Sequence, residues 1–302
     1  MDRNVELAYK LIKEPIDPNL RTPVELVEIC DASTADPGEI VKYFSSEDGN
    51  TDDIYSADAN GGLTIHKVSA VNPAQLTFVG LQSKLEYVLI DELLAAEDQG
   101  GLDRKKAAII RSMDKQEVKR IVDMILAIAS QEVDKDSGGD LLDTVIKMKQ
   151  KVEDYATDYI LLVGSTIQNK IDTYDKENVT TFNYKMPIMD EFAKLGIKKV
   201  VKVIGLVNGV ATLAATKAIL VGRNSNLSQG KPISLIRRKF SEKVAALAGV
   251  TGTPERLVSV ATTPTIINGS GLNTLGYGVF GYSSIIEACT NFRAVSWSDN
   301  LY

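Results

Sequence analysis

The chain has 302 residues and carries 34 Lys plus Arg against 40 Asp plus Glu, which gives a formal net charge of -6. Its 44% hydrophobic and 25% charged residues are typical of a globular protein, long enough for one large domain or about two. The acidic balance argues against a surface that grips nucleic acid through its phosphates, and two cysteines exclude a disulfide framework. No apolar run approaches the ~18 residues of a membrane span and no secretory signal opens the chain, so we predict a soluble cytoplasmic product without a membrane partner.

The first part of the chain predicts a helix followed by an extended arm. Apolar residues recur at helical spacing over residues 5–12, which indicates a short amphipathic helix. Three prolines between Pro15 and Pro23 prevent its continuation, because each fixes its own φ and favours extended geometry in the residue before it. We therefore expect an arm over residues 15–24 that does not pack as a regular element.

A long hairpin is predicted next. Ile40–Phe44 and Leu63–Val68 are rich in β-branched and aromatic residues and read as two strands. The polar, acidic segment 45–62 between them is longer than the ~12–15 residues beyond which unstructured loops become uncommon. We therefore expect a hairpin that projects from the body and carries an acidic tip.

Two capping boxes predict two helices. Ser83 with Glu86 precedes one apolar stripe, and Asp114 with Glu117 precedes another at i, i+3, i+4, i+7 spacing. A glycine pair should end each helix: Gly100–Gly101 the first and Gly138–Gly139 the second.

From Leu141 the predicted elements alternate, which indicates a compact α/β unit. The unit contains a helix from Leu141, a strand at Asp158–Val163, a helix capped by Ser165, a short helix after Pro187 and three strands, with an Asn208–Gly209 turn after the first. Beyond Arg256 the pattern is mostly strand and turn.

The sequence offers little for catalysis or for a cofactor. His66 is the only histidine and has no cysteine or serine partner beside it, so a base for nucleophilic catalysis is not predicted. The acidic tip fails the EF-hand pattern, because Asp53 and Ala59 occupy the glycine and glutamate positions counted from Asp48. We therefore read this tip as a solvated acidic loop, with low-affinity binding of a divalent cation as the alternative, and predict no catalytic residue, no cofactor and no metal site.

The segment GYGVFGYSSIIEA, from Gly276 to Ala288, contains a G-x-G-x-x-G spacing. A dinucleotide-binding loop needs this spacing between a strand and a helix inside a βαβ unit of about 30 residues, and too little chain follows Gly281 for that unit. The glycines are better explained by turns and close strand approach.

In order, these elements resemble the tailed-phage major capsid proteins with the Hong Kong 97 type fold. The resemblance rests on the proline-broken arm, the long hairpin, a helix able to serve as spine, the α/β unit and the terminal strands. It implies an α+β fold, with the spine helix being either the one from Ser83 or the one from Asp114. The implied parts are an N-terminal arm (1–37), an E-loop hairpin with a flanking strand (38–80), spine and peripheral-domain helices (81–140), an A-domain (141–245) and peripheral-domain return strands (246–302).

The resemblance also implies a function. A structural protein, not an enzyme, would self-assemble into the icosahedral head shell of a tailed phage and enclose double-stranded DNA. Its partners would be copies of itself in pentamers and hexamers, a scaffolding protein, a portal and a decoration protein, with weak contact to the DNA. It would be assembled in the host cytoplasm and reside in the virion. Assembly contacts are expected at Lys42, Tyr43, Asp52, Asp53, His66, Lys67, Arg237 and Arg238.

Three other functions stay open on the sequence. Encapsulins share the fold, so a non-viral compartment shell is a close variant. A small-ligand-binding α/β enzyme could use the 141–240 unit, with Asp158 or Asp172 in its site. A nucleic-acid-binding protein could use the basic run Arg237, Arg238 and Lys239, although no aromatic stacking set accompanies it.

Overall fold

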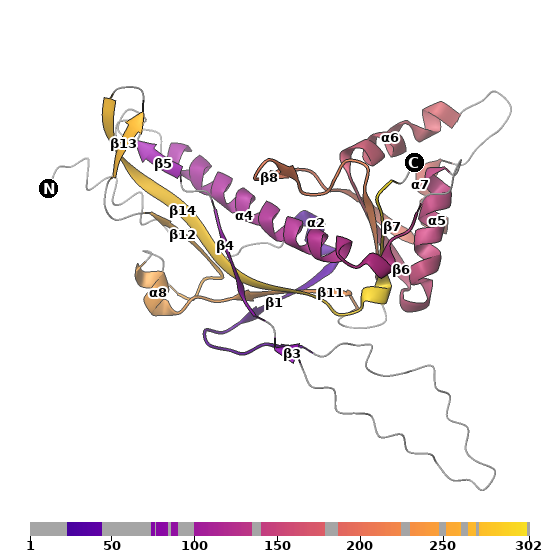
Figure 1. Cartoon of the computed structure of the whole chain (residues 1–302), viewed down its shortest axis with the longest axis horizontal. Helices are drawn as coiled ribbons and strands as arrows, with labels where there is room; N and C mark the ends of the chain where they lie inside the picture. The colour runs from indigo at the N-terminus through magenta and orange to yellow at the C-terminus, as the bar shows by residue number, and fades with distance from the viewer. Residues whose placement is uncertain are drawn as a thin grey trace, which may run out of the picture.

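The computed structural model describes residues 23–43, 74–75, 77–83, 86–89, 100–134, 140–178, 187–224, 230–247, 252–260, 265–269 and 272–300. A long helix lies along the larger of two mixed sheets, and the smaller sheet lies beyond the C-terminal end of that helix (Figure 1). Three expected features fall outside the described residues: the helix of residues 5–12, the acidic tip with Asp52 and Asp53, and the strand Leu63–Val68 with His66 and Lys67.

One very long strand organises the larger, seven-stranded sheet. β14, Leu272–Cys289, is 18 residues long, and five other strands pair with it antiparallel. These are β4 (Val79–Gln82), β5 (Glu86–Leu89), β11 (Ile233–Arg238), β12 (Arg256–Val260) and β13 (Thr265–Gly269). β1, Cys30–Ala35, joins the sheet by pairing parallel to β11.

The smaller sheet has four strands in the order β15-β10-β6-β7. Their bounds are β6 (Asp158–Val163), β7 (Ile197–Lys202), β10 (Ala218–Arg223) and β15 (Val295–Ser298). All six residues of β6 are buried, as a continuous apolar run predicts for a strand covered on both faces. The helices α5 (Leu141–Val152), α6 (Ser165–Asn178) and α7 (Ile188–Lys194) accompany this sheet.

The helix α4, Gly100–Leu126, spans 27 residues and packs along β14. One core continues from its buried face into both sheets, since Ile121 and Ile125 cluster with Leu235 of β11 and Ile219 of β10. A second core under α5 to α7 contains Met148, Ile167 and Phe192. α4 is thus the element that could serve as the spine.

Two small hairpins and several short helices complete the described chain. β2 (Lys42–Tyr43) pairs with β3 (Ala74–Gln75), and β8 (Leu206–Val207) pairs with β9 (Val210–Ala211). The Asn208–Gly209 turn is confirmed, with φ of 52° and 80° at its two residues. The short helices are α2 (Val24–Val27), η1 (Ala129–Gln131), η2 (Glu153–Tyr155), α8 (Glu242–Leu247) and η3 (Phe292–Ala294).

The helix predicted from Ser83 is wrong at its start. Glu86–Leu89 forms β5, and the Ser83 side chain does not cap a helix but accepts a hydrogen bond from the Gly281 N–H at 2.6 Å. The Ser83 N–H in turn donates to the Gly281 carbonyl at 2.8 Å. Pairing with β14 overrides the local capping pattern here.

The second capping box is wrong as well, because α4 begins earlier. Asp114 and Glu117 lie inside the helix, and Gly100 and Gly101, expected to end a helix, open it. The two carboxylates form ion pairs with distant arginines instead of capping the backbone.

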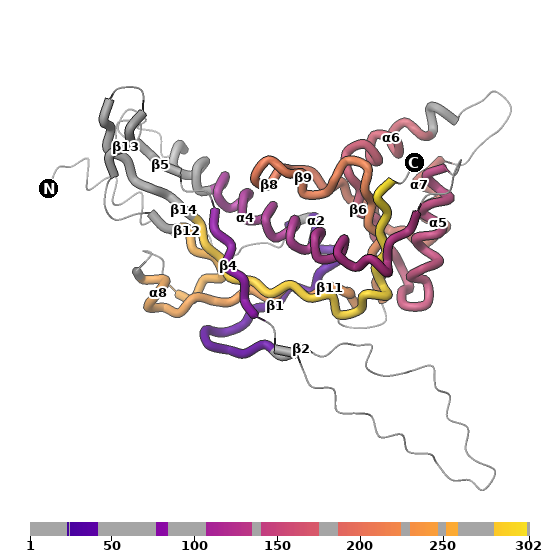
Figure 2. The backbone as a smooth tube through the Cα atoms, viewed as in Figure 1, coloured from indigo at the N-terminus to yellow at the C-terminus, as the bar shows by residue number. Residues whose placement is uncertain are grey.

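Three predicted part boundaries differ from the observed packing. Within the predicted arm, Leu26 and Ile29 are fully buried and β1 belongs to the large sheet, so residues 24–35 are part of the body. β11, placed in the A-domain by prediction, pairs in the large sheet. The C-terminal strand β15, predicted to return to the peripheral domain, joins the four-stranded sheet, as the path of the yellow tube shows (Figure 2).

The hairpin base also differs from prediction. Lys42 and Tyr43 were expected to pair with the strand Leu63–Val68, but their partners are Gln75 and Ala74. The strand that pairs with Lys42 and Tyr43 therefore lies later in the chain than the sequence pattern indicates.

Candidate functional site

The described residues hold no cluster of metal-binding side chains and no membrane-spanning helix. Among them, no group of three or more His, Cys, Asp or Glu side chains is placed to hold a metal ion. No helix within the described ranges is long and apolar enough to cross a membrane. Cys30 is buried, and desolvation raises the pKa of its thiol far above the usual range, so the thiolate needed of a nucleophile is disfavoured.

A cleft of about 570 Å³ lies beside the starts of β1 and β11. Its walls include Asp31, Tyr155, Lys231 and Asn291. The Lys231 ammonium donates to the carbonyl oxygens of Val27 at 2.6 Å and Cys30 at 3.2 Å. This amine is therefore engaged in holding the α2–β1 segment.

The two carboxylates of the enzyme alternative are each engaged locally. Asp158, at the start of β6, accepts a hydrogen bond from Arg223 at 2.5 Å. Asp172, on α6, accepts one from Gln168 at 2.8 Å. Both contacts are structural hydrogen bonds to neighbouring side chains. Neither of them brings Asp158 and Asp172 together in one site.

A buried charge cluster, made of Asp114, Glu117, Arg237 and Arg256, ties α4 to the large sheet. Glu117 is fully buried and accepts hydrogen bonds from Arg237 Nε at 3.2 Å and Nη2 at 2.8 Å, and from Arg256 Nε at 3.2 Å. Arg256 also donates to Asp114 at 2.6 Å. Burial by itself would lower the pKa of Arg256, but Glu117 and Asp114 hold that pKa above its ordinary value.

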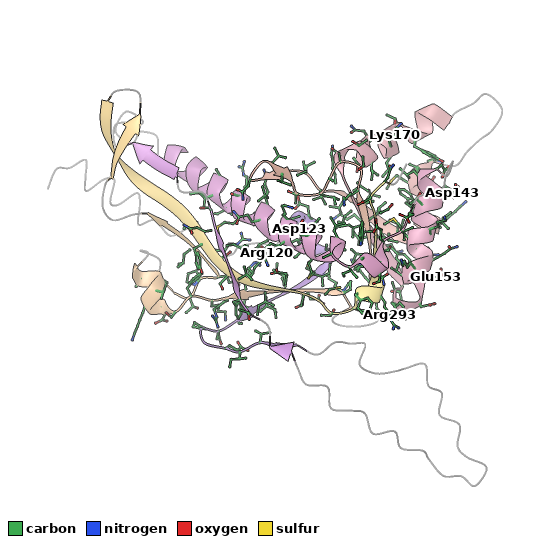
Figure 3. All side chains as sticks on the ribbon, viewed as in Figure 1. Arg120, Asp123, Asp143, Glu153, Lys170 and Arg293 are labelled. Carbon is green, nitrogen blue, oxygen red and sulfur yellow. The ribbon has the colours of Figure 1, made fainter. Side chains whose placement is uncertain are left out.

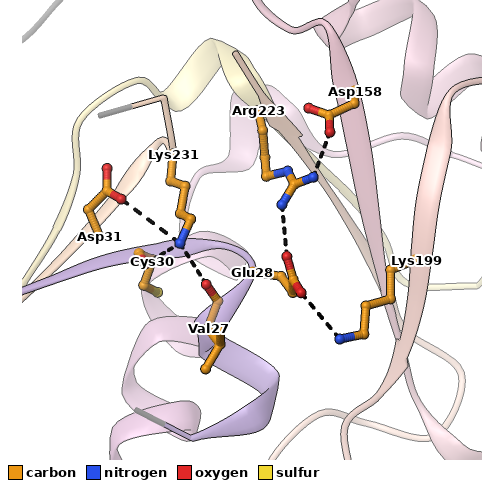
Figure 4. Close-up of polar contacts among 8 residues, drawn as sticks. All are labelled: Val27, Glu28, Cys30, Asp31, Asp158, Lys199, Arg223 and Lys231. Atoms are coloured by element: carbon orange, nitrogen blue, oxygen red, sulfur yellow. Dashed lines mark hydrogen bonds and ion pairs between the residues drawn. The ribbon is translucent and has the colours of Figure 1, made fainter. Parts of the chain in front are cut away.

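An inter-sheet bridge, made of Glu28, Asp158, Lys199 and Arg223, ties the N-terminal segment to the small sheet (Figure 4). Arg223, at the end of β10, donates to Glu28 at 2.8 Å as well as to Asp158. Lys199 of β7 reaches the other oxygen of Glu28 at 3.3 Å. The hydrogen bond to Asp158 is the main cause that raises the pKa of Arg223.

Both clusters have a mechanical consequence. β1 pairs with the large sheet through its backbone, while Glu28, just before it, is held by the small sheet. Charged side chains along the outer helices are instead solvated, such as Asp143 and Glu153 at the two ends of α5 (Figure 3). Among the described residues, the two clusters therefore connect α4 and the segment before β1 to the sheets.

The structure corrects the role predicted for Arg237. Its side chain is only 4% exposed and is held by Glu117, so it does not lie on the surface where a neighbour could contact it. Arg238, the next residue, is half-buried: its guanidinium lies 4.3 Å from the centre of the Phe78 ring and donates to the Glu39 carbonyl at 3.3 Å. Period-2 alternation along β11 turns the two arginines to opposite faces.

An exposed apolar hairpin is a feature that the sequence interpretation missed. It comprises residues 203–212, with β8 and β9 at its tip, and exposes Ile204 (57%), Leu206 (63%) and Val210 (57%). Thr212 closes its base, since its N–H and its hydroxyl both donate to the Gly205 carbonyl, at 2.9 and 3.2 Å. The sequence does carry a signal for this hairpin: apolar residues stand on both sides of Asn208–Gly209, where a solvated turn should be polar.

Comparisons with known proteins identify the fold. No family model matches the sequence, and no curated protein does. Solved structures do: a chain of the satellite phage P4 procapsid has a TM-score of 0.54 at 10% identity, covering 99% of this chain and 97% of that one. A chain of the capsid of an empty GTA particle has a TM-score of 0.51 at 11% identity, covering 94% and 92%. The SrpI encapsulin of Synechococcus elongatus PCC 7942 has a TM-score of 0.50 at 16% identity, covering 95% and 90%.

The chain therefore has the Hong Kong 97-like capsid fold, in agreement with the predicted α+β class. The similarity extends along nearly the whole chain, although the identity is too low to carry residue roles across. The segment Gly276–Ala288 lies within β14, a continuous strand, which excludes the helix that a dinucleotide-binding loop must open.

Proposed function

We propose that this chain is the major capsid protein of a tailed phage, a structural subunit that assembles with copies of itself into an icosahedral shell around double-stranded DNA. One observation supports this most: the near full-length match of this chain to chains of a procapsid and of a capsid. Pentamers and hexamers would form the lattice, with no cofactor and no turnover.

The internal construction suits such a subunit. A closed shell depends on many individually modest contacts whose geometry must be the same in every copy. The buried charge cluster and the inter-sheet bridge hold α4, β1 and the two sheets in a fixed relation. A stiff frame of this kind transmits the orientation of one surface to another across the subunit.

The contacts to neighbours follow as proposals. Lys42 and Tyr43 at the hairpin base, together with Asp52, Asp53, His66 and Lys67, are proposed to contact an adjacent subunit, as is Arg238. Removing residues 48–60 tests this: we expect a folded subunit that cannot close shells. Normal shells from that deletion would show that the tip is dispensable.

The proposed partners and location belong to the same function. A scaffolding protein, a portal and a decoration protein would join the shell, which is assembled in the host cytoplasm and becomes part of the virion. Packaged DNA would touch the inner surface weakly, because the net charge of -6 opposes a tight grip on phosphates.

An encapsulin-like compartment shell is the second candidate, supported by the match to the Synechococcus elongatus encapsulin. The phage head and the compartment shell differ in what the particle encloses rather than in the fold of the subunit. Nucleic acid inside purified particles would favour the phage head, and a protein cargo would favour the compartment.

Electron microscopy with size-exclusion chromatography tests the proposal. The chain is expressed alone and then together with the genes that flank its own. Closed shells, or rings of five and six, are the expected result. A monomer under every condition, even at high concentration, would overturn the proposal.

A further inference from the structure

The exposed apolar hairpin has features that point to a docking role. Its three apolar side chains, Ile204, Leu206 and Val210, are each more than half exposed, although the hairpin is well anchored at its base. The two-residue turn at Asn208–Gly209 adopts the left-handed geometry that fixes such a hairpin. A rigid element that presents apolar surface to water is typical of a site covered in an assembly.

The electrostatic surroundings of the hairpin indicate what covers it. Lys202, just before the hairpin, and Lys115, whose side chain carbons would lie 3.1 Å from a Cβ added at Gly205, are both exposed. Within the described part of the chain neither lysine forms an ion pair. A partner surface that complements this one is apolar and bordered by carboxylates.

This chain presents such a surface on α7. Met189 is 50% exposed and is followed directly by Asp190, which is exposed, and Glu191. Within the described ranges, the ion pair that the Glu191 carboxylate forms is a long one to Lys194, at 3.9 Å. The hairpin projects over α4, away from α7, so one subunit does not bring its own two surfaces together (Figure 1).

We propose that the exposed apolar hairpin of one subunit docks on the α7 surface of a second copy of this chain, with Leu206 near Met189 and Lys202 near the two carboxylates. The inference rests on the proposed function, of which it names one contact. Because the two surfaces differ, the contact is heterologous, and its repetition generates a closed ring where the rotation between neighbouring copies divides a full turn evenly.

Serine substitutions give the first test. Leu206→Ser and Met189→Ser should each raise the concentration needed for assembly about 10- to 100-fold, because a buried apolar side chain is removed from the contact. Val244→Ser, at an equally apolar and 44% exposed position on α8, is the matched control and should assemble like the wild type. All three sites are exposed, so thermal unfolding should not change.

Disulfide cross-linking between two introduced cysteines tests directly whether residues 206 and 189 of two subunits lie close together. Leu206→Cys and Met189→Cys are placed in separate preparations, both carrying Cys30→Ala and Cys289→Ala, and are mixed under mild oxidation. We expect a disulfide-linked heterodimer in the mixture and little linkage in either preparation alone. Val244→Cys mixed with Met189→Cys is the control and should not link.

The outcomes separate the contact from the shell. Linkage with closed wild-type shells supports both proposals. Linkage without shells under any condition supports the contact and overturns the shell function. Wild-type shells without linkage, and with normal assembly of Leu206→Ser, overturn the contact alone. A monomer without linkage overturns both.

Discussion

The Glu117 carboxylate, in the middle of α4, receives two hydrogen bonds from the Arg237 guanidinium of β11, at 3.2 and 2.8 Å, across 120 positions of sequence. Neither side chain is more than 4% exposed. A buried carboxylate that holds two arginines stabilises the fold only as a set, because each charge compensates the desolvation of the others.

Removing the shared carboxylate should therefore be costly. Glu117→Ala leaves Arg237 and Arg256 buried with too little negative charge, and we expect a loss of about 3–5 kcal/mol in the free energy of unfolding. Urea denaturation measures this loss. The control is Lys119→Ala, two residues after Glu117 on the same helix, which breaks a solvated ion pair with Asp123. It should lower the free energy of unfolding by only about 0.3–0.5 kcal/mol. Equal losses for the two variants would show that the buried Glu117 carboxylate contributes no more to stability than a solvated ion pair.

The inter-sheet bridge should act locally. Arg223→Ala removes the hydrogen bonds to Glu28 and Asp158, and since the arginine is 21% exposed we expect only about 1–2 kcal/mol of destabilisation. Hydrogen exchange of residues 24–35 should become faster, because Glu28 no longer ties this segment to the small sheet. Exchange in α5, which the bridge does not touch, is the internal control. Unchanged exchange at residues 24–35 would contradict the assignment.

The elements that could be predicted from sequence are those whose pattern is local and uninterrupted. The continuous apolar run of β6 and the Asn208–Gly209 turn carry their own signal. Ser83 and Glu117 were misread because a capping box describes only four neighbouring residues, whereas their actual partners, Gly281 and Arg237, lie 198 and 120 positions away.

The same limit applies to the candidate site. Nothing near β11 or β15 in the sequence tells which of two sheets each strand joins, because pairing partners are set by long-range packing. The apolar residues on both sides of Asn208–Gly209 could be recognised in the sequence. Their exposure to solvent could not, because it depends on where α4 and the small sheet place the hairpin.

Gly281 allows β14 to lie against α4. A Cβ at this position would come within 2.5 Å of Met113 Sδ and 2.7 Å of Ile109 Cγ2, and both side chains are buried. Gly281→Ala should lower the free energy of unfolding by about 1–3 kcal/mol through overpacking. Gly80→Ala is the matched control, because its added Cβ meets the hydroxyl end of Tyr282, which is 37% exposed and can move aside. A neutral Gly281→Ala would show that the helix shifts without cost.

Cys30 should make stability fall at high pH. Burial raises the pKa of its thiol above the ordinary value of 9.0, so the folded chain keeps a proton that the unfolded chain loses as the pH passes 9.0. Because the folded state then binds more protons, the free energy of unfolding decreases above that pH, by about 1.4 kcal/mol for each further pH unit from this group. Urea denaturation from pH 8 to about pH 10, with wild type and Cys30→Ala compared, isolates the contribution.

Thiol alkylation offers an independent measurement on the same residue. In a Cys289→Ala background only Cys30 can react, and at pH 9.0 we expect it to be alkylated on the order of 100-fold more slowly in the folded chain than in urea. In the reciprocal variant, Cys30→Ala, the remaining cysteine is Cys289, a half-buried residue, which should be less protected from alkylation. Rapid alkylation of Cys30 without denaturant would mean that the α2–β1 segment opens readily, and the inter-sheet bridge would then not be holding it.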